Sequence, residues 1–129
     1  MNKLDKESVI GISALLVHAA KIDEIYSDHE KNLVKDFIKS YLKDEDVGEI
    51  LKKAEEIENN SNQLLNFTNI IKQKSMELKK DIIEHLWKVI ISDKTVDQYE
   101  SNLMRRICGL IYLPDKECAE IKLKLMSNK

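Results

Sequence analysis

The residue types best suited to chemistry in this chain lie in two short polar breaks between apolar segments. They are six side chains that repeat with the same spacing at an offset of 70 residues: Asp23, Ser27 and Glu30, followed by Asp93, Asp97 and Glu100. Carboxylates and hydroxyls are hard oxygen ligands of the kind that Ca²⁺ and Mg²⁺ take in proteins. The spacing therefore predicts a divalent-cation site formed by two turns, provided that the fold brings the turns together.

Helix capping gives a second interpretation of the same residues. The segment from Ser27 to Glu30 fits a capping box, in which the serine hydroxyl accepts a backbone N–H and the glutamate reaches back to the serine backbone. Asp97 and Glu100 resemble a second box with aspartate in the cap position. The first acid of each turn stands instead at the end of a helical segment, where partial negative charge repels a carboxylate. A cation therefore explains these two acids better than capping does.

Other kinds of site fit the sequence less well. Asp93, Thr95 and Asp97 begin like an EF-hand loop, but Gln98 stands where that loop needs glycine and the next glutamate comes too early. The three histidines are not spaced as zinc ligands. The chain has no glycine-rich phosphate loop and no Ser-His-Asp or Cys-His order, so we expect no enzyme.

Composition predicts one all-α domain that spans residues 1–129. Apolar residues make up 43% of the chain and charged residues 34%, which is a balance typical of folded domains and not of disordered ones. Three glycines and one proline leave little turn chemistry for a β protein. The net charge of −2 argues against nucleic-acid binding.

Hydrophobic periodicity predicts about seven helices. The first runs from Asp5 to Lys21, with one buried face and with Gly11 placed for the close approach of another helix. Ser27 begins the second helix and Asp44 caps the third. A fourth helix lies around Phe67, a fifth restarts near residues 75–77, and a sixth follows the second acidic turn. The last helix follows Pro114 and partly buries three aliphatic side chains: Ile121, Leu123 and Leu125.

The offset of 70 residues extends beyond the acidic turns into the apolar positions. Ile12 matches Ile82 and Leu16 matches Leu86, with no gap needed. We therefore expect a pseudo-twofold internal repeat, with halves of about 5–58 and 75–128 joined by a linker helix of about 61–75.

The sequence also bears on location and redox state. No run of 18 apolar residues is present, so we do not expect the chain to be a membrane protein. Its first residues lack the apolar core of a signal peptide, which favours a cytoplasmic protein. The two cysteines, Cys108 and Cys118, are then expected to be reduced, and Cys108 is expected to be a buried structural thiol.

Taken together, these motifs resemble the TerB (tellurite resistance protein B) family. The first family motif is an apolar helix that ends in Ala-Asp-Gly and is followed by Ser or Asp and then Glu; the segment from Leu15 to Glu30 is similar to it. The segment from Leu86 to Ile107 resembles the second motif. Glu24 and Lys94 stand where the family usually has glycine.

The resemblance implies an internally repeated all-helical module that binds a divalent cation, Ca²⁺ or Mg²⁺, through the six residues named above. It also implies a role in tellurite-resistance and stress-response systems near the bacterial inner membrane, with a membrane-associated protein as partner. The alternative function is that of a metal-free helical adaptor, which would bind a protein in a groove between its helices.

Overall fold

Seven helices make up the part of the chain that the structure describes. The computed structural model describes residues 4–21, 26–43, 46–61, 65–91 and 98–127, and for residues 98–100 it describes the backbone alone. The helices are α1 (Lys6–Ala20), α2 (Asp28–Tyr41), α3 (Val47–Asn59), α4 (Leu65–Lys72), α5 (Met76–Ile91), α6 (Gln98–Leu110) and α7 (Asp115–Ser127). No described residue lies in a strand, which confirms the prediction of an all-α fold with about seven helices.

The helix starts follow the offset seen in the sequence. Lys6 and Met76, which open α1 and α5, lie 70 residues apart, and so do Asp28 and Gln98, which open α2 and α6. Between the two predicted halves lies α4, which packs against α1, α5 and α6. The superposition of the halves on one another stays a prediction.

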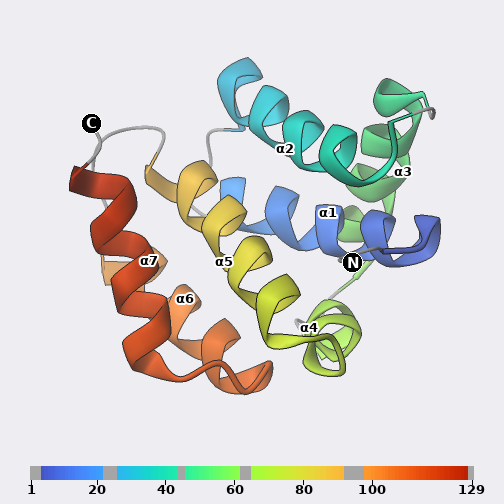
Figure 1. Cartoon of the computed structure of the whole chain (residues 1–129). Coiled ribbons are helices and arrows are strands. Elements are labelled where there is room, and N and C mark those ends of the chain that lie inside the picture. Colours follow the sequence, from blue (N-terminus) through green and yellow to red (C-terminus); the bar gives the residue numbers. More distant parts are fainter. Residues whose placement is uncertain (1–3, 22–25, 44–45, 62–64, 92–97, 128–129) are drawn as a thin grey trace.

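Helix α1 is the centre of the bundle and packs against α2, α3, α4 and α5 (Figure 1). Eleven of its 15 residues are buried, among them the small or weakly polar Gly11, Ser13 and Ala14. The sequence predicted one buried face for this helix, but the buried surface extends around most of it. A helix that is apolar on almost every side is stable only when other helices surround it.

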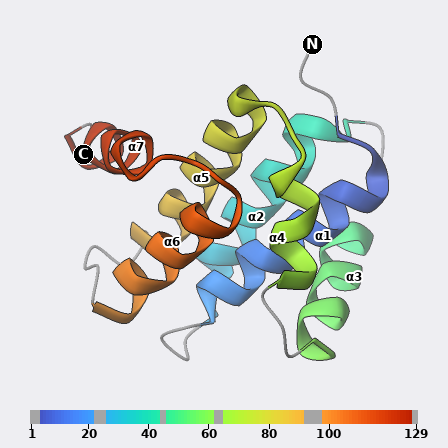
Figure 2. The same cartoon turned by 90° about the horizontal axis from the view of Figure 1, so that it is seen from below.

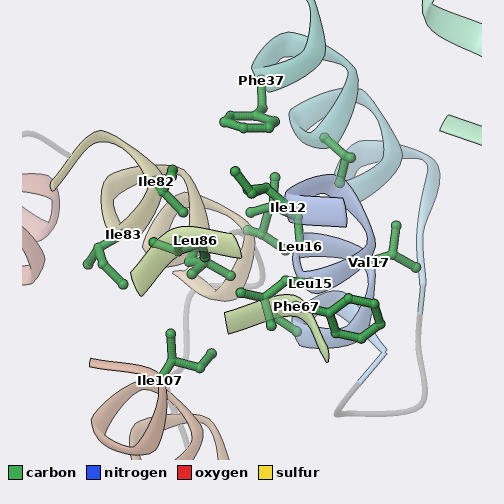
Figure 3. Close-up of a cluster of buried hydrophobic side chains, with 14 of the residues drawn as sticks. Ile12, Leu15, Leu16, Val17, Phe37, Phe67, Ile82, Ile83, Leu86 and Ile107 are labelled. Atoms are coloured by element: carbon green, nitrogen blue, oxygen red, sulfur yellow. The ribbon is translucent and has the colours of Figure 1, made fainter. Parts of the chain in front are cut away.

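The hydrophobic core is continuous across the bundle. Figure 3 shows side chains of α1, including Leu15 and Leu16, gathered with Phe37 of α2, Phe67 of α4 and Leu86 of α5. Each of these five side chains is at most 4% exposed. Because the core draws on both predicted halves, neither half buries its own apolar face alone.

Gly11 marks the closest approach between α1 and α4. A Cβ added at this position would lie 2.3 Å from the Cδ1 atom of Ile70. The absence of a side chain at Gly11 thus lets Ile70 pack onto the α1 backbone, as the sequence predicted for this glycine.

Two details of the helix termini differ from the sequence predictions. The cap of α3 is Asp46, not Asp44, because the Asp46 carboxylate accepts a hydrogen bond from the Glu49 N–H at 3.2 Å. In α7, Leu123 is 66% exposed, whereas Ile121 and Leu125 are partly buried as predicted. Leu123 lies on the side of α7 that no described helix covers.

A polar cluster joins α2 to α5 inside this packing. The Tyr41 hydroxyl donates a hydrogen bond to Asp81, whose carboxylate lies 3.7 Å from the His85 ring nitrogen Nε2. The His85 ring also makes an edge contact with Phe37 at a centroid distance of 5.1 Å. Burial lowers the pKa of His85, and the nearby negative charge of Asp81 opposes that shift.

The longest helix in the described ranges, α5, has 16 residues. None of the described helices is long and apolar enough to cross a membrane.

The contact at Gly11 predicts a measurable coupling with Ile70. Gly11→Ala should stabilise α1 by up to about 1 kcal/mol because alanine has the higher helix propensity. When Ile70 is present, its side chain must move to make room for the new Cβ atom, and the cost of that movement offsets the gain. In an Ile70→Val background, which lacks the Cδ1 atom, the same change should stabilise the protein by close to the full amount. Urea melts of the four proteins in this double-mutant cycle measure the difference, and additive effects would contradict the close contact.

The buried His85 predicts a pH dependence of stability. Folding lowers its pKa, so the unfolded chain binds the proton more readily; the stabilisation is complete above about pH 6.5 and declines as the pH falls below that value. The free energy of unfolding should therefore drop between pH 7 and pH 5.5 more steeply in the wild type than in His85→Leu. The carboxylates near this ring on α2 and α5 are present in both proteins, so the difference between the two slopes reports on His85. Equal slopes would show that His85 titrates as it does in the unfolded chain.

Candidate functional site

Only part of the predicted cation site falls within the described residues. Asp23, Asp93 and Asp97 lie outside them, and Glu100 lies on α6 without a described side chain. Ser27 and Glu30 are described, at the start of α2. The structure therefore shows the surroundings of the first turn and the helix ends that lead into the second.

Ser27 and Glu30 form the capping box that the sequence predicted. The Glu30 N–H donates to Ser27 Oγ at 3.2 Å, and the Ser27 N–H donates to Glu30 Oε1 at 2.9 Å. Glu30 is only 5% exposed, so its carboxylate is held against the bundle instead of extending into solvent. These contacts satisfy backbone donors at the N-terminus of α2 and fix the direction in which the chain enters that helix.

A tyrosine next to the cap connects the first turn to α3. The Tyr26 hydroxyl donates a hydrogen bond to Glu55 at 2.6 Å, and the Lys31 ammonium lies 5.1 Å from the centre of the Tyr26 ring. Burial raises the pKa of Tyr26, and the Glu55 hydrogen bond and the charge of Glu30 raise it further. Tyr26 therefore stays protonated and acts as a donor at any physiological pH.

Glu58, one turn further along α3, holds the C-terminal end of α1. It accepts a hydrogen bond from Lys21 Nζ at 2.8 Å and lies 3.2 Å from His18 Nδ1. Burial alone would raise the pKa of Glu58, but the hydrogen bonds with Lys21 and His18 outweigh it and lower the pKa. The basic side chains also offset the partial negative charge at the end of α1.

The carboxylates of Glu30, Glu55 and Glu58 all have partners within the protein. Glu30 of α2 is engaged by Ser27, and the α3 carboxylates Glu55 and Glu58 are engaged by tyrosine, lysine and histidine side chains. Within the described ranges, no group of three or more His, Cys, Asp or Glu side chains is placed to hold a metal ion. The described contacts therefore account for these carboxylates without a metal ion.

Sequence reasoning missed Tyr26, Glu55 and Glu58 as neighbours of the first turn. Glu55 and Glu58 are spaced three residues apart and so share a face of α3. That spacing is common on solvated helices. The packing of α3 against α1 identifies the partners of Glu58, and the chain that enters α2 supplies Tyr26 as the partner of Glu55.

The helix ends that lead into the two acidic turns lie on the same side of the bundle. In Figures 1 and 2, α1 and α5 run in the same general direction, and their C-terminal ends lie at the same side in both views. The two helices also pack against each other. The described ends of the two helices therefore lie on one side of the bundle, although they are far apart in the sequence.

Comparison with known proteins is consistent with this architecture. The family described as Tellurite resistance protein TerB matches residues 10–123, which is most of the chain. The chain belongs to the TerB family. The match begins within α1 and ends within α7, and it includes both acidic turns. No curated protein and no solved structure gave a match.

The capping box in this TerB chain predicts a stability cost that does not depend on metal. Ser27→Ala should lower the free energy of unfolding by about 1 kcal/mol because the Glu30 N–H loses its partner. Asp97→Ala should cost a similar amount if Asp97 caps α6 in the same way. Urea melts in EDTA test both, with Ser40→Ala on the exposed face of α2 as a control that should not destabilise. An unchanged midpoint would show that the residue concerned is not a working cap.

Proposed function

We propose that this protein is a non-catalytic TerB module that binds a divalent cation, Ca²⁺ or Mg²⁺, at its two acidic turns. The ligands would come from both turns, with Asp23 and Asp93 as the two central carboxylates. The module would serve a bacterial stress-response or tellurite-resistance-type system. It would signal the binding of the cation to a protein partner. This function combines the family membership with the residue pattern of the turns.

The observation that carries the proposal is the side-by-side packing of α1 and α5 with their C-terminal ends on the same side. Because the acidic turns follow these ends in the sequence, we infer that the two turns share one site. This packing supports a shared site more strongly than the repeat in the sequence could by itself.

Electrostatics gives the reason for a cation at this place. The C-terminal end of a helix carries partial negative charge, so acids that follow two adjacent ends repel both the ends and each other. At α1 the basic side chains of Lys21 and His18 are already engaged by Glu58. A divalent ion would relieve the repulsion that remains between the paired acids.

Thermal melts test the cation. The wild-type Tm should rise when millimolar Ca²⁺ or Mg²⁺ replaces EDTA, and a hundredfold excess over Kd corresponds to about 2.7 kcal/mol of stabilisation. Asp23→Asn and Asp93→Asn should leave the metal-free protein as stable or slightly more stable, yet each should abolish the metal-dependent rise.

Asp46→Asn is a matched control for these variants. It removes one negative charge from the α3 cap but keeps a residue that caps equally well, so its response to metal should equal that of the wild type. If neither ion shifts the wild-type midpoint, the cation proposal is wrong.

The metal-free adaptor is the second candidate, and an open cleft favours it. The cleft, of about 830 Å³, lies between the start of α1, the end of α3 and α4, and its lining includes Ile57, Phe67 and Ile70. Ile57 is 43% exposed, and nearby Leu65 on α4 is 47% exposed. Grooves of this kind bind apolar anchors of a partner peptide or helix, and the adaptor function would stand if the melts show no response to metal.

A further inference from the structure

The corner between α6 and α7 brings the two cysteines of the chain together. The α6 helix ends in a Schellman motif: the Leu113 N–H donates to the Cys108 carbonyl at 2.9 Å, and the Tyr112 N–H donates to the Gly109 carbonyl at 3.3 Å. Tyr112 adopts the left-handed conformation that this motif requires, with φ of 61°. The chain reverses there, and α7 packs back against α6 and α5 (Figure 2).

Cys108 lies one turn before this reversal and Cys118 in the first turn after it. Both thiols are buried, at 0% and 7% exposure, and they lie close enough for an interaction between them to shift both pKa values. Cys118 also shares the lining of a hollow with Met104, which stands one turn before Cys108 on α6. The structure records both as free thiols. A disulfide requires Cα atoms within about 7 Å of each other, and two thiols on packed helices that are linked by a short turn are well placed for one.

Only Cys118 faces a route from solvent. It lines an open hollow of about 430 Å³ whose walls also include Trp87, Arg105 and Lys122. The fully buried Cys108 is not part of this lining. An oxidant that diffuses into the hollow would therefore meet Cys118 first.

The surroundings of Cys118 favour its thiolate. The Trp87 indole N–H is buried and finds no acceptor at hydrogen-bond distance among the described residues, yet it lies near enough to act on the Cys118 sulfur. The Lys122 ammonium sits 5.2 Å from the centre of the Trp87 ring. The hydrogen bond from Cys108, and then the Trp87 N–H and Lys122, lower the pKa of Cys118 against the effects of burial and of Asp115.

Cys108 has the complementary role in this pair. Its hydrogen bond to Cys118, together with burial, raises the pKa of the Cys108 thiol, so the shared proton stays on Cys108. The pair thus resembles a nucleophilic thiolate beside a protonated resolving thiol, an arrangement that suits reversible oxidation.

We propose that Cys118 is a peroxide-reactive thiol whose sulfenic acid is resolved by Cys108, giving an intramolecular disulfide that fixes α7 to α6. Neither cysteine is among the residues proposed to bind the cation, so the two proposals can be tested separately.

The oxidant is a hydroperoxide, and the two steps balance. The Cys118 thiolate attacks the peroxide oxygen, the O–O bond breaks, and with one proton taken up the products are Cys118 sulfenic acid and an alcohol, or water from hydrogen peroxide. The Cys108 sulfur then attacks the Cys118 sulfur, the S–O bond breaks, and the Cys108 proton leaves with the oxygen as water. Overall the two thiols lose two electrons and the peroxide gains them.

The disulfide would act on the helix that has the fewest buried residues in the described structure. Cys118 is the one buried residue of α7 in the described structure, and Leu123 and Met126 are 66% and 46% exposed. A covalent bond at the first turn of α7 restrains a helix that otherwise depends on few buried contacts. Oxidation should therefore slow hydrogen exchange of the α7 backbone amides.

Treatment of the pre-reduced full chain with hydrogen peroxide tests the proposal. The expected product is a species lighter by two hydrogen atoms, with Cys108 and Cys118 linked in a non-reducing peptide map and with no covalent dimer. In Cys108→Ala, dimedone should label Cys118 as the trapped sulfenic acid. In Cys118→Ser, Cys108 should remain a free thiol, and circular dichroism confirms that each variant is folded.

Trp87→Phe provides a test that leaves both cysteines in place. It keeps an aromatic ring in the core but removes the indole N–H, so disulfide formation should be severalfold slower; an unchanged rate would overturn the role given to Trp87. The dithiol proposal is overturned if the wild type keeps both thiols under peroxide or forms only intermolecular disulfides. The proposal is also overturned if dimedone labels Cys108 in Cys118→Ser as fast as it labels Cys118 in Cys108→Ala.

Discussion

The burial of α1 on nearly all sides is the constraint on which the rest of the structure depends. A helix with this many apolar and small residues cannot face water, so four other helices must pack around it. The lack of side-chain bulk at Gly11 lets α4 come close on one side, and α5 takes another. Helices α2 and α3 also pack on α1, and α6 and α7 pack on α4 and α5 to complete the core.

This central position also decides where the polar residues of α1 can go. His18 and Lys21 stand at its C-terminal end, where both meet the Glu58 carboxylate of α3. The side chain of Glu58 is only 11% exposed, whereas those of Lys21 and His18 are 38% and 43% exposed. It is therefore the carboxylate that needs partners, because a charge removed from water is costly unless it is paired. The ordered shell of the first acidic turn is therefore a consequence of enclosing α1 and does not by itself require a ligand.

The two proposed sites lie in regions of different character. In the sequence the acidic turns follow α1 and α5, two helices of the packed centre of the bundle, and the carboxylates of Glu30, Glu55 and Glu58 are engaged by an ion pair, hydrogen bonds and a cap. The thiol pair lies at the α6–α7 corner, where one helix is held by few buried side chains. A cation would act on the packed part of the fold, whereas oxidation would act on its most exposed helix, so the two can respond to separate signals.

Much of the fold could be predicted from the sequence because it depends on local patterns. Periodicity and composition determined the helices, the Ser27–Glu30 capping box and the role of Gly11 in close packing, and the order of the motifs indicated the TerB family. Each of these is set by residues that are near one another in the chain, or by a backbone demand that a single residue type meets.

Tertiary structure decided what depends on contacts between distant segments. The burial of α1 on all sides, the Tyr26–Glu55 and Lys21–Glu58 pairs, and the meeting of Cys108 with Cys118 were not predicted. Spacing within one helix shows which residues share a face, but the partner that covers this face is chosen by the packing of the whole chain. The sequence therefore determined which residues could act, and the arrangement of the helices decided which of them act together.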